Sequence, residues 1–220
     1  MVTPMLAPHE LIQSAPLTDS LRILAATGDL RRYAKGTLLI DEGERGDTLF
    51  IILAGKLRVF STDSDTGREI TYGVYEQGDY LGEMGLDGRP RSASVITMEP
   101  SICVRIDRPL LESHVREHPE FAFELIIRLI RRARAATVGL RQIAFNDVYG
   151  RLKHLLESLA VDQPDGSRLL SEPLTHRDMA ARVGCGREMV SRVMKDLERG
   201  KYLDADGKRI RLMGKLPPRW

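Results

Sequence analysis

The apolar positions of this chain change their spacing twice along its length. Leu17, Leu21 and Leu24 recur at helical steps, which predicts helical structure over residues 10–31. Residues 36–105 instead hold short β-rich runs, such as TLFIIL and SASVIT, which glycines separate at near-regular intervals. Short strands with this punctuation predict a β-sandwich or barrel, and the DSDTGRE segment is typical of a hairpin tip.

A long helix is predicted next, from Pro119 to Phe145. The segment has no internal proline and a single glycine, Gly139. Its apolar positions recur at steps of four and three and form one stripe, which consists of Phe121, Leu125, Leu129, Ala133, Ala136, Leu140 and Ile143. A helix of this length spans roughly 40 Å, and such a stripe is typical of a coiled coil. We expect a parallel homodimer seam here, and packing against the chain's own domain is the alternative.

The last part of the chain, residues 146–220, predicts a small domain with two helices joined by a tight turn. Its pattern is a helix, a turn at QPDG, three short helical segments and a hairpin whose turn lies in DADGKR. Thr175 can cap one short helix, and Asp178 three residues later supports the same helix end. Gly184 can make the turn into a second helix, which begins near Gly186.

The second of these helices has two distinct faces. Its apolar face has the spacing of a helix that packs on a core, and consists of Val190, Val193, Met194 and Leu197. The opposite face is polar and lies mostly in the N-terminal half, where a recognition helix contacts base edges in the major groove. Arginine can donate two hydrogen bonds to guanine, and glutamate can accept one from cytosine. The candidate DNA-contacting residues are Thr175, Arg187, Glu188, Ser191, Arg192 and Lys195.

Charge and composition favour a nucleic-acid partner and exclude several other classes of protein. Residues 1–118 carry 13 Lys and Arg against 18 Asp and Glu, whereas residues 146–220 carry 15 against 11, and a basic domain suits a polyanion. Two separated cysteines, Cys103 and Cys185, exclude an all-cysteine iron–sulfur or zinc site within one chain. No metal-ligand spacing, catalytic triad or paired carboxylate is recognisable, so we expect neither a metal nor an enzyme. No apolar run approaches the ~20 residues of a membrane span, and we expect a cytoplasmic protein.

Three segments together resemble one protein family. GEMGLDGRPRSASV combines three glycines with an acid and with an arginine that small residues follow, a combination that a core does not need. With GRLKHLL after the long helix and VGCGREMVSRVMKDLE in the last domain, it resembles the cyclic AMP receptor protein / fumarate–nitrate regulator family of bacterial transcription factors. The resemblance covers about residues 15–215. The first segment is similar to that family's phosphate-binding cassette.

The resemblance implies a cyclic-nucleotide site in the β-rich domain, and the residue types suit it. Small residues let backbone N–H groups form a nest for an anion. Arg91 can pair with the cyclic phosphate, Ser92 can donate to it, and Glu83 can accept from the ribose 2′-hydroxyl. A structural Arg91–Glu83 salt bridge is the alternative. The family also contacts the base from the long helix, at positions matching Ala136 and Thr137, where Ala136 departs from the family's pattern. The expected ligand residues are Gly82, Glu83, Met84, Arg91, Ser92, Ala93 and Thr137.

The resemblance also implies the architecture and the function. The expected fold is α+β: a cyclic-nucleotide-binding β-roll (jelly roll) at 1–118, a dimerisation helix at 119–145 and a winged helix-turn-helix at 146–220. We expect a homodimeric transcription regulator that binds palindromic double-stranded DNA and RNA polymerase. Cyclic AMP ranks first as the controlling ligand and cyclic GMP second. Two alternatives stay open, namely a member of this fold that is active without ligand and one that responds to cyclic di-GMP.

The DNA sequence that such a regulator reads is constrained but not fixed. By resemblance, Arg187, Glu188 and Arg192 indicate a half-site similar to TGTGA. Ser191 beside Arg192 also resembles the other branch of the family, whose half-sites are of the TTGAT type. Both half-sites, and both activation and repression, therefore stay open.

Overall fold

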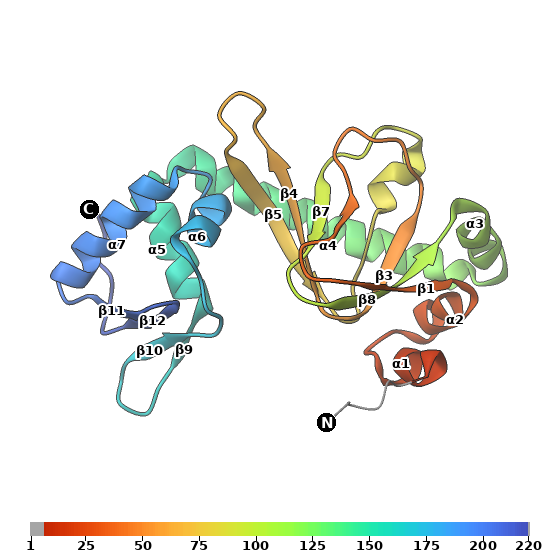
Figure 1. Cartoon of the computed structure of the whole chain (residues 1–220), viewed down its shortest axis with the longest axis horizontal. Helices are drawn as coiled ribbons and strands as arrows, with labels where there is room; N and C mark the ends of the chain where they lie inside the picture. The colour runs from red at the N-terminus through yellow and green to blue at the C-terminus, as the bar shows by residue number, and fades with distance from the viewer. Residues whose placement is uncertain (1–6, 220) are drawn as a thin grey trace. The chain divides into compact units, whose positions relative to one another are not determined.

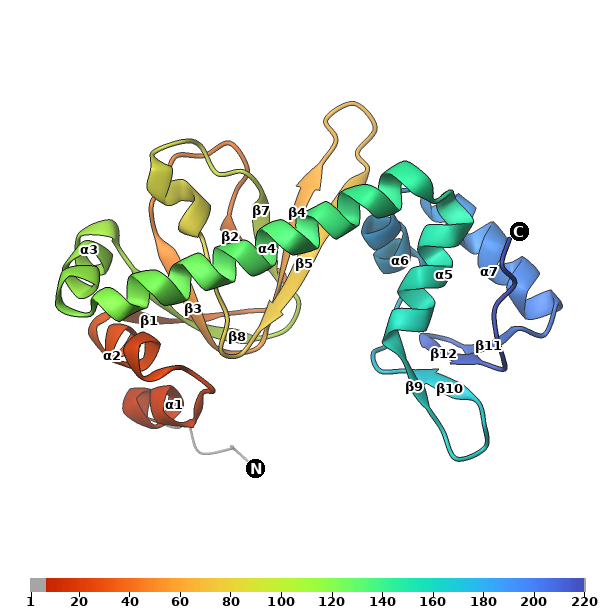
Figure 2. The same ribbon diagram turned by 180° about the vertical axis from the view of Figure 1, so that it is seen from behind.

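A computed structural model of the chain describes residues 7–219 and divides the chain into two compact units. The first unit comprises Met1–Ser61 and Tyr72–Ala133, and the second comprises Thr62–Thr71 and Arg134–Trp220. Figures 1 and 2 show the elements from opposite sides. The long helix α4 (Pro119–Phe145) is continuous and contributes residues to both units.

The first unit is a β-roll built from two four-stranded sheets. The strand order is β1-β8-β3-β6 in one sheet and β2-β7-β4-β5 in the other. The strands are β1 (Asp29–Tyr33), β2 (Leu38–Ile40), β3 (Leu49–Ala54), β4 (Lys56–Thr62), β5 (Glu69–Glu76), β6 (Tyr80–Leu81), β7 (Ser94–Thr97) and β8 (Ser101–Ile106). The predicted β-rich domain is therefore confirmed, with glycines at positive φ, such as Gly55 at 93° and Gly78 at 92°, in the turns between strands.

Alternation along β3 gives the first unit two apolar layers. Leu49, Ile51 and Leu53 belong to the layer that includes the flanking helices. Phe50 and Ile52 belong to the layer between the two sheets. Both layers exclude water, because each of these side chains is at most 5% exposed. Successive strand residues point to opposite faces, so one strand serves both layers.

Three short helices flank the roll, and they differ from the helical segment predicted over residues 10–31. They are α1 (Pro8–Ser14), α2 (Asp19–Thr27) and α3 (Arg108–Glu117). Pro16 separates α1 from α2 because proline lacks the N–H that a continuing helix needs. Residues after Gly28 form β1 rather than helix, and a Cβ at Gly28 would lie only 2.4 Å from the Ile106 side chain. The predicted helix is therefore wrong at both places.

Helix α4 is buried only at its start. Phe121 is 0% exposed and packs in the core of the first unit, and Leu125 packs against the same core. Leu129 is 44% exposed and Leu140 67%. The predicted dimer stripe is therefore corrected at its first two positions, because Phe121 and Leu125 pack against the chain's own domain. The rest of the stripe is exposed in the single chain.

The second unit joins the end of α4 to helices and a four-stranded sheet of order β11-β12-β10-β9. Its remaining elements are α5 (Val148–Leu159), β9 (Ala160–Asp162), β10 (Arg168–Leu170), α6 (His176–Val183), α7 (Arg187–Arg199), β11 (Leu203–Asp206) and β12 (Arg209–Leu212). The predicted hairpin at Gly207 is confirmed. Two of the three predicted short helices are α6 and α7. The predicted turn at QPDG is confirmed, because it closes the hairpin of β9 and β10 with Gly166 at φ 79°.

Candidate ligand and DNA-binding sites

A tight turn between β6 and β7 holds the segment that was expected to bind phosphate. It begins at Gly82, whose φ is 97°, and continues as the 3-10 helix η1 (Glu83–Asp87). A Cβ at Gly82 would lie 2.4 Å from the Thr48 carbonyl oxygen, and one at Gly85 would lie 2.2 Å from the Gly46 carbonyl oxygen. Real Cβ atoms do not approach so closely, so the turn requires glycine at both positions.

Arg91 lies beneath this turn and is 8% exposed. Its Nη1 donates to the Gly82 carbonyl at 2.7 Å, and its Nη2 donates to the Thr48 carbonyl at 2.9 Å. Burial lowers the pKa of Arg91, and the nearby charges of Asp47 and Glu83 oppose that shift. Arg91 therefore fastens the turn to the loop before β3. A guanidinium has five N–H donors, so these two bonds leave donors for an anion.

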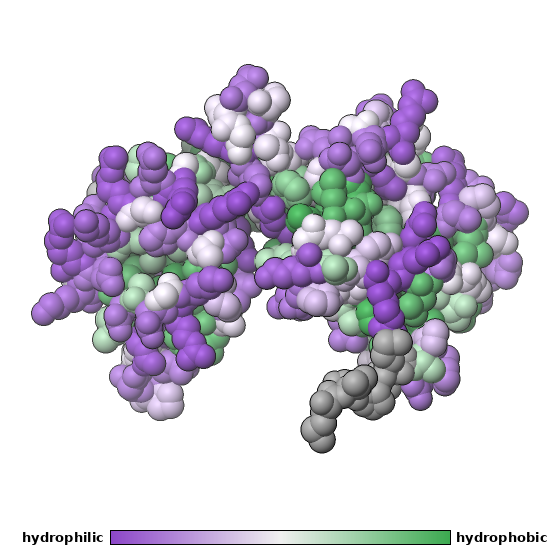
Figure 3. Space-filling model, viewed as in Figure 1, coloured by the Kyte–Doolittle hydropathy of each residue, from purple (hydrophilic) through white to green (hydrophobic). Residues whose placement is uncertain are grey.

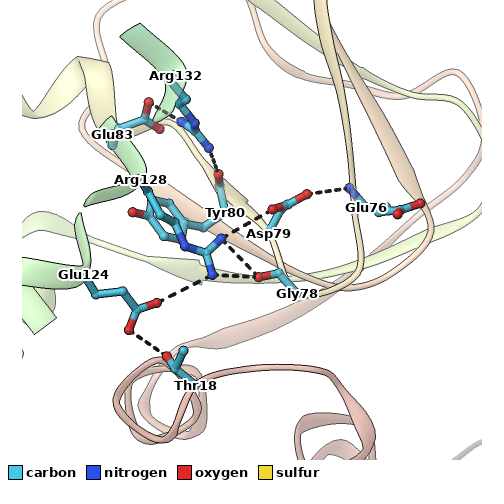
Figure 4. Close-up of polar contacts among 9 residues, drawn as sticks. All are labelled: Thr18, Glu76, Gly78, Asp79, Tyr80, Glu83, Glu124, Arg128 and Arg132. Atoms are coloured by element: carbon cyan, nitrogen blue, oxygen red, sulfur yellow. Dashed lines mark hydrogen bonds and ion pairs between the residues drawn. The ribbon is translucent and has the colours of Figure 1, made fainter. Parts of the chain in front are cut away.

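Glu83 pairs with Arg132 of α4 and not with Arg91. Its Oε1 accepts a hydrogen bond from Arg132 Nη1, and its side chain is 8% exposed. Arg132 also donates to the Tyr80 carbonyl (Figure 4). Its guanidinium lies 4.8 Å from the Tyr75 ring centre. Burial alone would lower the pKa of Arg132, but the hydrogen bond and charge of Glu83 outweigh it and raise that pKa. The alternative of a structural Arg91–Glu83 salt bridge is not what the structure has.

The second carboxylate oxygen of Glu83 has a different environment. Glu83 Oε2 is buried and has no hydrogen-bond partner among the residues that the structure describes. A buried polar atom without a partner is costly, so such atoms are rare and call for an explanation. A ligand hydroxyl at this position would satisfy the Oε2 atom.

Arg128, one turn before Arg132, extends the polar contact between α4 and the roll. Its guanidinium lies 3.4 Å from Asp79, 3.5 Å from Glu124 and 4.8 Å from the Tyr80 ring centre. The Tyr80 ring therefore has Arg128 on one side and Arg132 within 5.5 Å (Figure 4). Such cation–π contacts stabilise the helix position. Sequence reasoning missed both arginines, although Glu124, Arg128 and Arg132 recur at steps of four and so share one helix face.

Six of the seven predicted ligand residues lie at or next to this turn in the first unit, and the seventh, Thr137, belongs to the second unit. Ser92 and Met84 are exposed beside the turn, with Ser92 Oγ 3.3 Å from Met84 Sδ. Thr137 is exposed on the part of α4 that belongs to the second unit. The residues of the first unit that lie at or next to the turn are Gly82, Glu83, Met84, Arg91, Ser92 and Ala93. With a buried cation, an exposed hydroxyl and an unpaired carboxylate oxygen, they fit a sugar phosphate.

In the second unit, α6 and α7 form the predicted helix-turn-helix. Thr175 caps α6, because its side chain accepts from the Asp178 N–H while the Asp178 carboxylate accepts from the Thr175 N–H. Gly184 ends α6 in the left-handed conformation, at φ 71°. Helix α7 buries Val190, Val193, Met194 and Leu197 in the core of the unit. The N-cap of α7 is Gly186, which offers no side-chain cap.

The polar face of α7 is open to solvent at four of the predicted DNA-contacting positions. These are Arg187, Glu188, Arg192 and Lys195, and hydrophilic side chains cover this helix in the space-filling view (Figure 3). Ser191 is half-buried, and its Oγ lies 2.7 Å from His176 Nδ1 of α6. The Thr175 hydroxyl is likewise engaged, in the helix cap. The exposed members of the set are thus on α7.

Within residues 7–219, no group of three or more His, Cys, Asp or Glu side chains could hold a metal ion. Across the same residues, no helix combines the length and apolar character that crossing a membrane requires. Cys103 is buried, which raises the pKa of its thiol to about 12.

Comparison with known proteins identifies both halves of the chain. Residues 30–118 match the cyclic nucleotide-binding domain family, and residues 150–214 match the Crp-like helix-turn-helix domain family. The cAMP-activated global transcriptional regulator of Pasteurella multocida is 30% identical over 211 residues, which cover 92% of this chain and 99% of that protein. Its counterpart in Escherichia coli O6:H1 is 29% identical over 212 residues, covering 93% and 99%.

Solved structures give the same result. The global regulator CLP of Xanthomonas campestris, described as c-di-GMP responsive, has a TM-score of 0.79 at 26% identity and covers 89% of this chain and 98% of its own. A CooA mutant from Carboxydothermus hydrogenoformans, at 20% identity and TM-score 0.74, shares the fold over 94% of this chain and 91% of its own. The chain therefore belongs to the cyclic AMP receptor protein / fumarate–nitrate regulator family and is a DNA-binding transcription regulator with a cyclic nucleotide-binding domain.

Proposed function

We propose that this regulator acts in the cytoplasm as a homodimer and that a cyclic nucleotide, cyclic AMP before cyclic GMP, controls its binding to DNA. The main support for a bound nucleotide is Glu83 Oε2, a buried carboxylate oxygen with no hydrogen-bond partner among the described residues. Glu83 belongs to the turn that Arg91, a buried cation, bonds, and the charges of the two residues influence one another. A ribose hydroxyl and a cyclic phosphate supply the donor and the anion that these groups need.

Each residue of the site has a separate role in this proposal. Arg91 pairs with the phosphate through the N–H groups that its backbone bonds leave over, and Ser92 donates its hydroxyl. Glu83 accepts from the 2′-hydroxyl, while backbone groups from Gly82 and Ala93 complete the nest. Thr137 bonds the purine. The bound ligand shifts the population toward the form that binds DNA, because it binds that form more tightly.

The support for a dimer is the exposed apolar face of α4. Leu129, Leu140 and Ile143, which belong to the predicted stripe, are 44–67% exposed. A monomeric protein rarely leaves such a row of apolar side chains in water. A second copy of the same helix covers it in a parallel coiled coil. The working divisions of the chain are then a sensor domain at 1–118, a dimerisation helix at 119–145 and a DNA-binding domain at 146–220.

DNA recognition in this proposal relies on α7. Arg187, Glu188 and Arg192 contact base edges, and Lys195 contacts a phosphate. Ser191 and Thr175 position the two helices, since their hydroxyls already bond to His176 and within the cap. A two-fold dimer prefers a palindrome whose half-sites lie about 10–10.5 bp apart, centre to centre. RNA polymerase is the further partner.

Calorimetric titration of the full-length protein with cyclic AMP, cyclic GMP and cyclic di-GMP tests the ligand. Ser92→Ala is the informative variant because Ser92 is exposed and lies outside both apolar layers. It removes one hydrogen bond to a charged group and weakens cyclic AMP binding by about 1.5–3 kcal/mol. Arg91→Ala is a poor test, since it also removes the donor of two partly buried carbonyl groups, those of Gly82 and Thr48. No binding of any of the three compounds would reject ligand control through this turn.

One observation favours a second candidate function. Arg91 and one oxygen of Glu83 have hydrogen-bond partners within the chain, and these contacts help to hold the turn in place. A regulator that binds DNA without ligand, or one that responds to cyclic di-GMP as its relative from Xanthomonas is described to do, fits that arrangement. Selection of binding sites from randomised DNA, with and without cyclic AMP, distinguishes ligand-independent DNA binding from control by cyclic AMP. Equal recovery of one palindrome in both conditions would favour ligand-independent binding.

A further inference from the structure

The tip of the β4–β5 hairpin is an acidic segment that folds with the DNA-binding unit. Thr62–Thr71 belongs to the second unit, together with α6 and α7. The Gly67 N–H donates to the Asp63 carbonyl at 2.9 Å, which closes the tip. The segment carries three acids, Asp63, Asp65 and Glu69, against a single base, Arg68. An acidic element within a DNA-binding unit has a charge opposite to that which DNA requires.

This hairpin lies along α6, the first helix of the helix-turn-helix. Arg177 Nη2, at the start of α6, donates to Glu69 Oε1 at 2.9 Å. The Ile70 side chain lies 3.9 Å from the position that a Cβ on Gly184 would occupy, at the other end of α6. Arg68 of the hairpin also lies close enough to Cys185, the residue after Gly184, for its charge to act on the thiol. Burial raises the pKa of Cys185, and the charge of Arg68 is one of those that oppose this shift. Contacts at both ends of α6 therefore involve consecutive residues of the hairpin.

Arg177 is well placed to contact the DNA backbone. It is the second residue of α6, and in a helix-turn-helix the first helix crosses the phosphate backbone. The Arg177 side chain is 76% exposed, whereas that of Glu69 is 18% exposed. A guanidinium binds a carboxylate and a phosphate through the same N–H donors. One guanidinium group can satisfy Glu69 or a phosphate, and in this structure it bonds Glu69.

We infer that Glu69 is an internal competitor for a DNA phosphate at Arg177, so that the hairpin restrains DNA binding. Arg177 gives up the Glu69 carboxylate when it bonds DNA. The restraint is modest because an ion pair with one exposed partner contributes about 0.2–1 kcal/mol, which corresponds to about 1.4- to 5-fold in affinity. It acts on every DNA sequence alike, since phosphate contacts carry no base information. It adds to ligand control and does not depend on it.

A double-mutant cycle on the full chain tests this inference. The proteins are the unmutated chain, Glu69→Gln, Arg177→Ala and the double variant, each titrated with a selected palindromic duplex and with a duplex of unrelated sequence. Glu76→Gln is the matched control, because Glu76 is also on β5 but pairs with Lys56 in the first unit. Melting curves by circular dichroism verify that each variant is folded.

The expected result is that Glu69→Gln tightens binding to both duplexes by about 1.4- to 5-fold per protomer, and that the gain vanishes in the Arg177→Ala background. Arg177→Ala alone weakens binding to both duplexes and lowers the salt slope by about one per protomer. An unchanged affinity for Glu69→Gln, a gain that survives without Arg177, or an equal gain for Glu76→Gln would overturn the inference. No DNA binding by the unmutated chain would instead refute the helix-turn-helix assignment, and the inference with it.

Discussion

The contact between Glu83 and Arg132 contributes to the stability of the first unit by an amount that its burial lets us estimate. Arg132→Gln removes the cation that pairs with the Glu83 carboxylate in the proposed ligand site. The Glu83 charge then has neither its ion-pair partner nor full access to water. We therefore expect the variant to unfold at lower denaturant concentration than the unmutated chain. Arg131→Gln on the next position of α4 is the matched control, since that side chain is exposed.

The size of the effect follows from the burial of the pair. The Glu83 side chain is 8% exposed and the Arg132 side chain 25%. Removing one partner of a fully buried pair costs about 3–5 kcal/mol, and an exposed pair contributes about 0–1 kcal/mol. The partial exposure of Arg132 places the cost of Arg132→Gln at about 2–4 kcal/mol. In the double variant with Glu83→Gln no carboxylate is left unpaired, so the coupling energy is about 1–3 kcal/mol.

Urea denaturation of the full chain, followed by circular dichroism, measures these quantities. The two units need not unfold together. The unfolding transition that the Glu83 and Arg132 variants shift is therefore assigned to the first unit. Arg131→Gln changes the free energy of unfolding by less than about 0.5 kcal/mol. A coupling energy below about 0.5 kcal/mol between Glu83 and Arg132 would refute the reasoning, since contacting buried charges couple more strongly than that.

Three further predictions concern assembly, DNA and pH. Leu129→Glu places a charge in the proposed seam and converts dimer to monomer in sedimentation; an unchanged dimer would mean the seam lies elsewhere. Arg192→Ala relaxes the preference for one G·C pair and costs about 1–3 kcal/mol of binding free energy per half-site, whereas Lys195→Ala weakens binding to all DNA sequences alike. Selection from randomised DNA measures both effects, and an unaltered base preference for Arg192→Ala would contradict base recognition by α7. Burial, then the neighbouring His118, lowers the pKa of His114 below 6.5. The unfolded chain therefore binds more protons than the folded chain, so the free energy of unfolding falls as pH drops below about 6.5. His114→Gln flattens this dependence in urea titrations at different pH, and an equal slope would contradict it.

Much of the fold was predictable because local chemistry sets it. Glycines between short apolar runs predicted the β-roll, and the Gly184 turn predicted the helix pair of the second unit. The errors arose where tertiary packing decides the outcome. Residues 29–33 pair with β8 and so form a strand, although the segment before them is helical. Phe121 continues the apolar stripe of α4 but is buried in the core of the first unit.

The candidate site was predictable only in part, for a similar reason. The segment from Gly82 to Ala93 is local, so its glycines, acid and arginine could be found in the sequence. Arg132 lies 49 residues from Glu83, and its place opposite that carboxylate depends on the rotation of α4 about its axis. Spacing along α4 gives the face that Arg128 and Arg132 share but not what that face contacts. The partner of Glu83 therefore required the structure.

Arg91 has a consequence for how relatives of this protein diverge. It joins the turn at Gly82 to the carbonyl of Thr48, so it holds two distant segments of chain together. A relative that binds no ligand would still be selected to keep this arginine, because without it the Gly82 and Thr48 carbonyl groups lose a hydrogen-bond donor. Ser92 is exposed and under no such constraint. Loss of the ligand over evolution would therefore first appear as drift at position 92, beside an arginine that does not change.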